Sequence, residues 1–315
     1  MKYILKKGIT LIITLFIVSI FTFTMFQVIP GDSALSALGM SATEQQLEDY
    51  REAMGLNKSL PIRYGIWLSK AITGDFGTSV QYKMPVSQLI RDRLPVTIWL
   101  AVISFILIII VSLPLGIVSA KKKNHPSDHV ITTLTQVSMA IPAFFLGMIL
   151  SYIFGVILKW FTPGKYVSYS ESFTGFLSFM IFPAIAIAIP KIAMLVKFLR
   201  SSILRQMKLD YVRTARSKGM KEQDILYKHV LKNALIPVIT FLAMMLADIM
   251  AGAILIEQVF NLPGLGRTLL VAISNRDFNV VQAIILYIAT VVIGINFAVD
   301  LLYQRIDPRV NVKNS

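Results

Sequence analysis

Residues 94–120 have the sequence LPVTIWLAVISFILIIIVSLPLGIVSA, which contains no charged side chain. A helix rises about 1.5 Å per residue, so a helix of this length exceeds the roughly 30 Å thickness of a bilayer's hydrocarbon core. The run is also too long for the core of a water-soluble fold. It therefore predicts a helix that crosses a membrane.

Five further apolar runs predict helices of the same kind. Within the first run, residues 9–29 would rise about 32 Å as a helix. The fourth run contains Lys191 near one end, where a lysine side chain can reach the membrane interface. The predicted fold is an all-α polytopic membrane protein with six transmembrane helices, at 8–31, 94–120, 130–158, 172–196, 235–256 and 279–299.

The first run also has features of a signal peptide, because Lys2, Lys6 and Lys7 precede it. Its apolar part is longer than the usual h-region of about 7 to 15 residues, and residues 27–30 offer no small-residue cleavage site. A retained transmembrane helix is therefore the favoured interpretation.

Composition points to the same class of protein. Of the 315 residues, 55% are hydrophobic and only 15% are charged, whereas about a quarter are charged in an average soluble domain. The chain has no cysteine, which excludes disulfides, thiolate zinc sites, iron–sulfur clusters and cysteine nucleophiles. Its three histidines leave little material for a metal centre, so no metal site and no cofactor are predicted on this chain.

The formal charge of +14 follows from membrane topology. Six crossings put both termini on one side, and with the N-terminus inside that side carries 20 basic and six acidic residues. The opposite side carries 11 of each, so the whole surplus is cytoplasmic, as the positive-inside rule expects. Binding to nucleic acid is not needed to explain the charge.

The predicted spans divide the chain into an N-terminal transmembrane helix at 1–30, an extracytoplasmic segment at 31–93 and a core domain at 94–315. The extracytoplasmic segment contains helix-like stretches at 43–54 and 62–72 and a turn at 74–79. Five prolines have the potential to kink spanning helices; they are Pro114, Pro142, Pro183, Pro190 and Pro237.

A basic cytoplasmic loop at 200–235 contains the most informative pattern. Gly219 suits the positive-φ position that ends a helix, and Lys218 in the last turn suits the negative end of the helix dipole. Beyond it, apolar residues at 225, 226, 230 and 231 recur at helical spacing. A helix–glycine–helix hairpin at the membrane face is predicted. Charge alone favours a solvated basic loop, whereas the apolar stripe favours docking into a groove on a partner.

This loop resembles the EAA loop of permease subunits in ATP-binding-cassette (ABC) importers. With Gly219 aligned, only Ala215, Gly219 and Leu231 match the general pattern, whose proline would fall at Lys232. The strings at 210–219 and 232–237 look more like the oligopeptide, dipeptide and nickel branch, in which the proline comes five residues later. The first of that branch's two permeases is the subunit that the chain resembles.

Further strings carry the same resemblance in the same order along the chain, and together they cover nearly all of it. They are Pro30-Gly31-Asp32, Gly74-Asp75-Phe76-Gly77-Thr78-Ser79, Arg93-Leu94-Pro95-Val96-Thr97, the segment 257–266 and Asp307-Pro308-Arg309.

The resemblance implies the type I importer permease fold in a bacterial or archaeal plasma membrane. It also implies a second permease as heterodimer partner, two cytoplasmic ATPases that bind ATP and Mg, and an extracytoplasmic solute-binding protein. The residues that it assigns to ATPase coupling are Tyr211, Arg213, Thr214, Ala215, Arg216, Lys218, Gly219, Ile225, Leu226, Leu231, Asn233 and Pro237.

Enzymatic function is not predicted. The phosphate-binding pattern Gly-x4-Gly-Lys-Ser/Thr does not occur, and the lookalike at 264–268 has arginine in place of lysine and lacks the first glycine. ATP hydrolysis is therefore expected on partner subunits.

The translocation path is predicted from polar residues in and after the fifth span. Asp248 faces either a cavity or a partner charge, since ionisable groups in membranes usually do. Glu257 and Gln258 either line an outward gate or are ordinary interface residues.

Short peptides are the expected cargo, and nickel or a metal chelate is the alternative. The absence of histidine and cysteine from the outer half argues mildly against bare metal. An ion-coupled secondary transporter would explain six spans and Asp248, but it leaves the cytoplasmic hairpin without a role. A membrane anchor or assembly factor is a third alternative.

Overall fold

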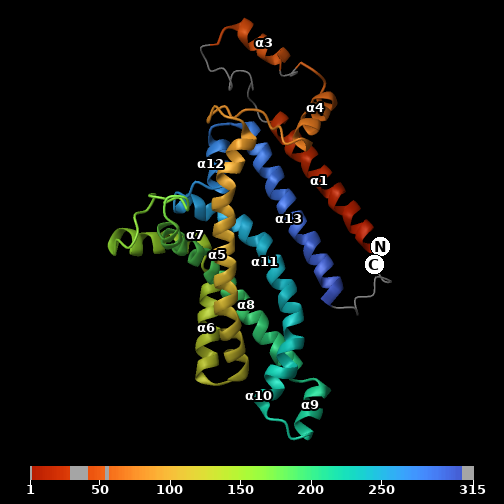
Figure 1. Ribbon diagram of the computed structural model, residues 1–315, viewed down its shortest axis with the longest axis vertical. Helices are drawn as coiled ribbons and strands as arrows, with labels where there is room; N and C mark the ends of the chain where they lie inside the picture. Colours follow the sequence, from red (N-terminus) through yellow and green to blue (C-terminus); the bar gives the residue numbers. More distant parts are fainter. Residues whose placement is uncertain (1, 29–41, 54–56, 307–315) are drawn as a thin grey trace. The chain divides into compact units, whose positions relative to one another are not determined.

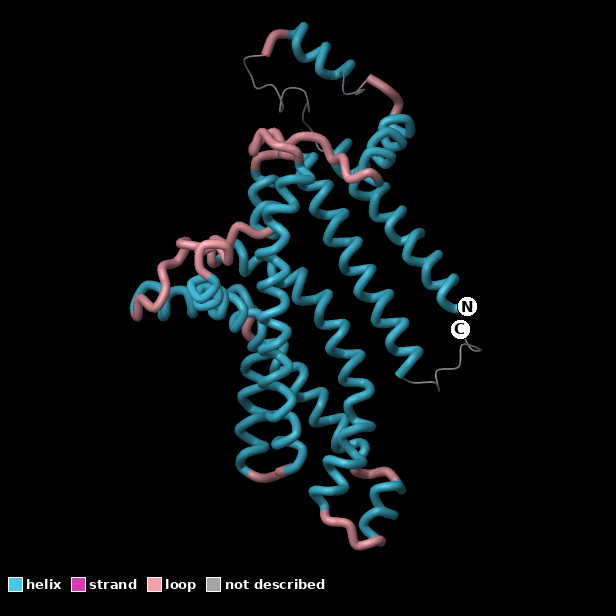
Figure 2. Tube along the Cα trace, in the orientation of Figure 1, coloured by secondary structure: helices cyan, strands magenta, loops and turns pink. Residues whose placement is uncertain are grey.

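The computed structural model describes residues 2–28, 42–53 and 57–306, and their regular structure is helical apart from an isolated bridge between Thr78 and Pro85 (Figures 1 and 2). Two compact units divide the chain. One consists of Met1–Val96 and Pro263–Gly294, and the other of Thr97–Leu262 and Ile295–Ser315. The predicted motifs at 30–32 and 307–309 lie outside the described residues.

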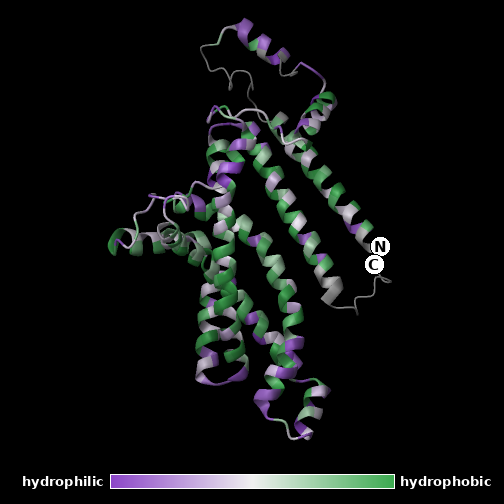
Figure 3. Cartoon of the chain, in the orientation of Figure 1, coloured by the Kyte–Doolittle hydropathy of each residue, from purple (hydrophilic) through white to green (hydrophobic). Residues whose placement is uncertain are grey.

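Five helices are long and apolar enough to cross a membrane, by length and composition within the described residues. Figure 3 shows apolar residues along most of α5, α11 and α13, and polar residues on α3 and α10. The five are Leu5–Phe26 within α1 (Lys2–Val28), α5 (Val86–Lys121), α8 (Phe173–Gln206), the helix Glu222–Val259 and Phe278–Leu301 within α13 (Phe278–Ile306). They confirm the first, second, fourth, fifth and sixth predicted spans.

The third predicted span is not one straight helix. It consists of α6 (Pro126–Ala140) and α7 (Ala143–Leu150), which continues as a π-helical turn, η1 (Ser151–Ile157), and the two parts meet at a bend of 97°. Ile141 is extended at φ −94° and ψ 123°, the conformation that a following proline favours. Pro142 has no N–H to continue the helical ladder, so the chain restarts as α7. The other four candidate prolines, Pro114, Pro183, Pro190 and Pro237, lie inside long helices.

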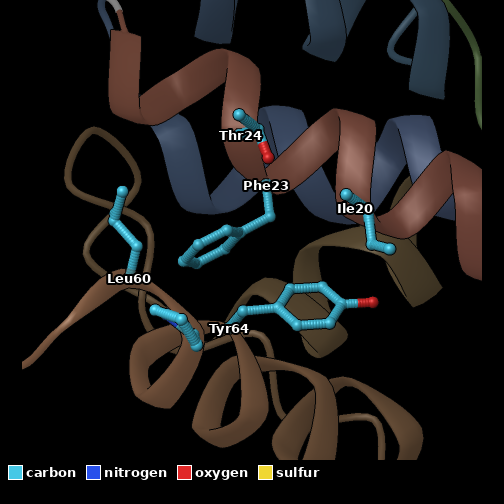
Figure 4. A pocket seen from close by; sticks show the side chains of 6 residues that line it. Ile20, Phe23, Thr24, Leu60 and Tyr64 are labelled. Atoms are coloured by element: carbon cyan, nitrogen blue, oxygen red, sulfur yellow. The ribbon is translucent and has the colours of Figure 1, made fainter.

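In the first unit, α4 (Leu60–Ile72) packs against α1 through aromatic rings. The Tyr64 ring lies edge-on to Phe23 at a centroid distance of 5.4 Å, and the Tyr64 hydroxyl is 2.7 Å from the Ser19 hydroxyl. Figure 4 shows these two rings beside a cavity of about 230 Å³ between the helices. Helices α3 (Glu44–Ala53) and α4 confirm the two helical stretches predicted at 43–54 and 62–72 within the described residues.

The predicted turn at 74–79 is present, with Gly74 and Gly77 at φ of 81° and 77°. It is held to the chain after α12 (Leu265–Ser274) by Asp277, which is fully buried. The Ser79 hydroxyl donates to Asp277 Oδ2 at 2.5 Å, and the Gln81 N–H donates to the same oxygen at 3.1 Å. These bonds join segments almost two hundred residues apart in the sequence.

In the second unit, α8 packs against α6, α7 and α11 (Leu231–Val259). Small residues of α8, among them Ala184, Ala188 and Ala193, are buried, and they permit the close helix approach typical of membrane bundles. The Phe198 and Phe241 rings stack at 4.5 Å between α8 and α11.

Candidate functional site

The segment between α8 and α11 forms a short helical hairpin (Figure 1). Helix α9 (Asp210–Ser217) ends with Lys218 as its C-cap, and Gly219 follows at φ 77°. The Gly219 N–H donates to the Arg216 carbonyl and the Met220 N–H to the Ala215 carbonyl, which closes the end of the helix. The predicted helix stop at Gly219 is therefore confirmed.

The second helix of the predicted hairpin is not separate. The short α10 (Glu222–Asp224) and the π-helical turn η2 (Ile225–Val230) continue into α11 as one helix of 38 residues, Glu222–Val259. The end of the hairpin is thus the beginning of the fifth spanning helix. Because η2 and α11 belong to one helix, a displacement of α9 that also moves η2 would move the beginning of α11.

Three of the four residues of the predicted apolar stripe are buried within the chain, so that Leu231 alone of them is partly exposed for the predicted docking on a partner. Ile225, Leu226 and Val230 of η2 are at most 4% exposed, and Val212 and Ala215 of α9 are also buried. Helix α9 contacts η2. The tight turn at Gly219 folds the apolar face of α9 onto the first turns of the next helix, so that the two faces cover each other.

The exposed face of the hairpin is polar and basic. Arg216 is bound by Glu222 through two hydrogen bonds of 2.6 and 3.1 Å, which raise the pKa of its guanidinium. Of the residues assigned to coupling, some are exposed, some half-buried and some buried. Exposed are Arg213, Thr214, Arg216, Lys218, Gly219 and Asn233; half-buried are Tyr211, Leu231 and Pro237; buried are Ala215, Ile225 and Leu226.

An ion pair between a buried carboxylate and a half-buried guanidinium was not predicted from the sequence. Asp128 of α6 is 2% exposed and accepts two hydrogen bonds from Arg200 of α8, at 2.8 and 2.7 Å. The Ser119 hydroxyl of α5 donates to the same carboxylate at 2.5 Å, and the Asn124 N–H donates at 3.0 Å. The sequence feature that points to this pair is that Asp128 is the sole acidic residue between Asp92 and Glu171. Three helices are tied together by this one carboxylate.

Asp248 of α11 has a charged partner in α8. Lys191 Nζ lies 2.8 Å from Asp248 Oδ2, with the lysine side chain 20% and the aspartate side chain 60% exposed. Lys191 stands in the middle of α8 and not near its end, because that helix continues to Gln206. The prediction that the Lys191 side chain reaches the membrane interface from the end of its helix is therefore wrong, and its ammonium pairs with Asp248 instead.

Glu257 and Gln258 differ in their surroundings. Glu257 is fully buried, and its carboxylate accepts a hydrogen bond from the Thr97 hydroxyl at 2.6 Å. The Gln258 side chain is exposed. The structure therefore does not bring these two side chains and Asp248 to one surface, and their role in a path stays a prediction.

The glycine-rich segment at 264–268 is a helix start. Gly264 is the N-cap of α12, and the Thr268 hydroxyl donates to the Gly264 carbonyl at 2.7 Å. Gly264, Gly266 and Thr268 are buried, so the backbone is not open to a phosphate.

Long apolar helices with a basic hairpin between two of them define the class: a polytopic membrane protein. The chain belongs to the family of binding-protein-dependent transport system inner membrane components, whose profile matches residues 112–312. The N-terminal profile of the same components matches residues 1–101. The family is a transport component of ABC systems and is not itself catalytic.

Curated relatives match over almost the whole chain. The probable peptide ABC transporter permease protein y4tP of Sinorhizobium fredii is 35% identical, with 98% of each chain covered. The oligopeptide transport system permease protein AppB of Bacillus subtilis is 36% identical, also with 98% of each covered. The dipeptide transport system permease protein DppB of Alkalihalophilus pseudofirmus is 35% identical, covering 98% of this chain and 99% of its own.

A solved structure has the same fold. The crystal structure of an amino acid ABC transporter with histidines matches with a TM-score of 0.52 at 16% identity, over 70% of this chain and 94% of that one. The predicted ABC permease fold is thereby confirmed.

Proposed function

We propose that this chain is a permease subunit of an ATP-driven importer and forms the path for short peptides together with a second, homologous permease. The observation that carries this proposal is the near-complete match to relatives named for peptide, oligopeptide and dipeptide transport. An extracytoplasmic solute-binding protein would deliver the cargo. Two ATPase subunits, which hold ATP and Mg, would supply the energy.

The exposed face of α9 and its glycine turn is the proposed contact for an ATPase. The apolar stripe is covered by the chain itself, so the contact would use exposed polar residues such as Arg213, Thr214 and Lys218. The buried contact of α9 with η2 would make the hairpin rigid, and the continuous helix from Glu222 would carry its movement into α11. Such coupling requires two states that nucleotide favours differently.

The charge asymmetry supports a proposed orientation with both termini and the hairpin in the cytoplasm. The membrane proposed from the family resemblance is the plasma membrane of a bacterial or archaeal cell. The chain has no cysteine, so a single introduced cysteine reports its side without background. In intact cells, Gln81→Cys should react with an impermeant maleimide and Lys221→Cys should not; both sites are exposed. The reverse labelling pattern would invert the proposed topology.

Uptake in proteoliposomes tests the function. Proteoliposomes that contain the chain, its second permease and the ATPases, supplied with the binding protein, should take up a labelled peptide. Uptake should require ATP and Mg on the side of the membrane that the ATPases face. Uptake by this chain alone under an ion gradient would instead establish a secondary transporter. Uptake of nickel or its chelate but not of peptide would show that the cargo is the metal or its chelate, the alternative considered above.

The same assay tests the path. Asp248→Asn leaves the Lys191 ammonium without its carboxylate in a spanning helix, and we expect peptide uptake to fall several-fold. Asp248→Asn combined with Lys191→Gln removes both charges. It is the matched control, because it shows whether a loss of uptake in Asp248→Asn comes from the uncompensated Lys191 charge. Unchanged uptake in Asp248→Asn would assign the pair a purely structural role.

A further inference from the structure

A second cavity lies at the level where the spanning helices end. It has a volume of about 370 Å³ and is formed by the end of α5, the end of α8 and the beginning of the Glu222–Val259 helix. This volume is within the range of small-ligand sites, roughly 300 to 1,000 Å³. All of its lining residues belong to the unit Thr97–Leu262 and Ile295–Ser315.

The lining of this cavity is amphiphilic. Ile203, Leu204, Met207 and Leu226 provide an apolar wall, and three lysines, Lys121, Lys123 and Lys208, provide its charge. The one acid in the lining, Glu222, is already paired with Arg216. The three lysines are exposed, and none has an ion-pair partner in the described part of the chain. The cavity therefore has an excess of positive charge beside a wall of apolar side chains.

The cavity spans the boundary between apolar and charged sequence. The uncharged run of α5 ends at Ala120, and charged residues begin at Lys121. One and two turns earlier, Val118 and Leu115 are 39% and 36% exposed and offer an apolar surface for hydrocarbon. This arrangement is that of a site at the depth of lipid headgroups, where basic residues attract anionic lipids.

We propose that this cavity binds an anionic phospholipid. Its phosphate would interact with Lys121, Lys123 and Lys208, while the glycerol and the start of the acyl chains would contact Ile203, Met207 and Leu226. An anion without chains would leave the apolar wall in contact with water, and a zwitterionic lipid would leave the lysine charge uncompensated. An anionic amphiphile satisfies both parts of the lining.

Native mass spectrometry of the full chain, titrated in detergent with phosphatidylglycerol or phosphatidylcholine, tests this site. Each lysine near an anionic surface contributes roughly a factor of five in binding. We therefore expect Lys121→Gln, Lys123→Gln and Lys208→Gln together to weaken phosphatidylglycerol binding at least tenfold. Lys122→Gln, Lys221→Gln and Lys232→Gln together make the same charge change at exposed sites outside the cavity and should change it less than twofold.

Four results would overturn the proposal: equal weakening in the two triple variants, unchanged binding in the cavity variant, equal binding of the two lipids, or displacement of the lipid by inorganic phosphate. Sodium chloride at matched ionic strength controls for screening in the phosphate arm. Melting temperatures of all variants establish that each is folded. None of these outcomes depends on which cargo is transported.

Discussion

Replacing Asp128 with alanine should destabilise the protein by about 3 kcal/mol and lower its melting temperature in detergent by at least about 5 °C. The substitution leaves the Arg200 guanidinium, whose side chain is 26% exposed, without its carboxylate. It also removes the acceptor for the Ser119 hydroxyl and the Asn124 N–H. Removing one partner of a buried ion pair is costly because the remaining charge has no compensating group.

Two further variants separate this effect from a general loss of charge. Asp224→Ala breaks an exposed pair with Lys228 at 2.8 Å and should cost no more than about 1 kcal/mol. Asp128→Leu combined with Arg200→Met removes both charges and should recover the part of the loss that comes from the uncompensated Arg200 guanidinium. A melting temperature for Asp128→Ala within about 1 °C of the wild type would refute the proposed interlock of α5, α6 and α8.

Local sequence was sufficient to predict most spanning helices and the glycine turns. An uncharged run long enough to cross a bilayer is a property of neighbouring residues, as is a glycine that ends a helix before a polar turn. Pro142 was among the prolines predicted to kink a helix, but a break of 97° was not predicted, because hydropathy is continuous across residues 130–158 while the backbone is not. A proline inside a spanning helix does not by itself decide between a kink and a break, since Pro183 and Pro190 lie within α8.

The site was harder to predict because its contacts are distant in sequence. Asp128 and Arg200 are 72 residues apart, and Lys191 and Asp248 are 57 apart. The stripe at Ile225, Leu226 and Val230 was identified correctly as apolar. Periodicity, however, does not say whether an apolar face is covered by a partner or by the same chain, and here α9 folds onto it.

Gly219→Val should reduce ATP-dependent uptake at least tenfold while leaving insertion and expression of the protein unchanged. A Cβ at Gly219 would meet no atom within 4 Å, so added bulk is not the obstacle. The obstacle is the backbone: at φ 77° a residue with a Cβ is strained by about 1–3 kcal/mol, and a β-branched residue most of all. That strain opens the turn that folds α9 onto η2, and an opened hairpin transmits no force to α11.

Gly219→Asn is the matched control, because asparagine adopts the left-handed conformation more readily than other side chains and occupies the same open space. We expect its uptake to stay within about twofold of the wild type. ATPase activity measured on the assembled transporter shows whether the valine variant still hydrolyses ATP without uptake, as an uncoupled transporter would. Normal uptake by Gly219→Val would mean that the hairpin turn does not transmit force, and equal losses in both variants would assign the effect to the side chain and not to the backbone.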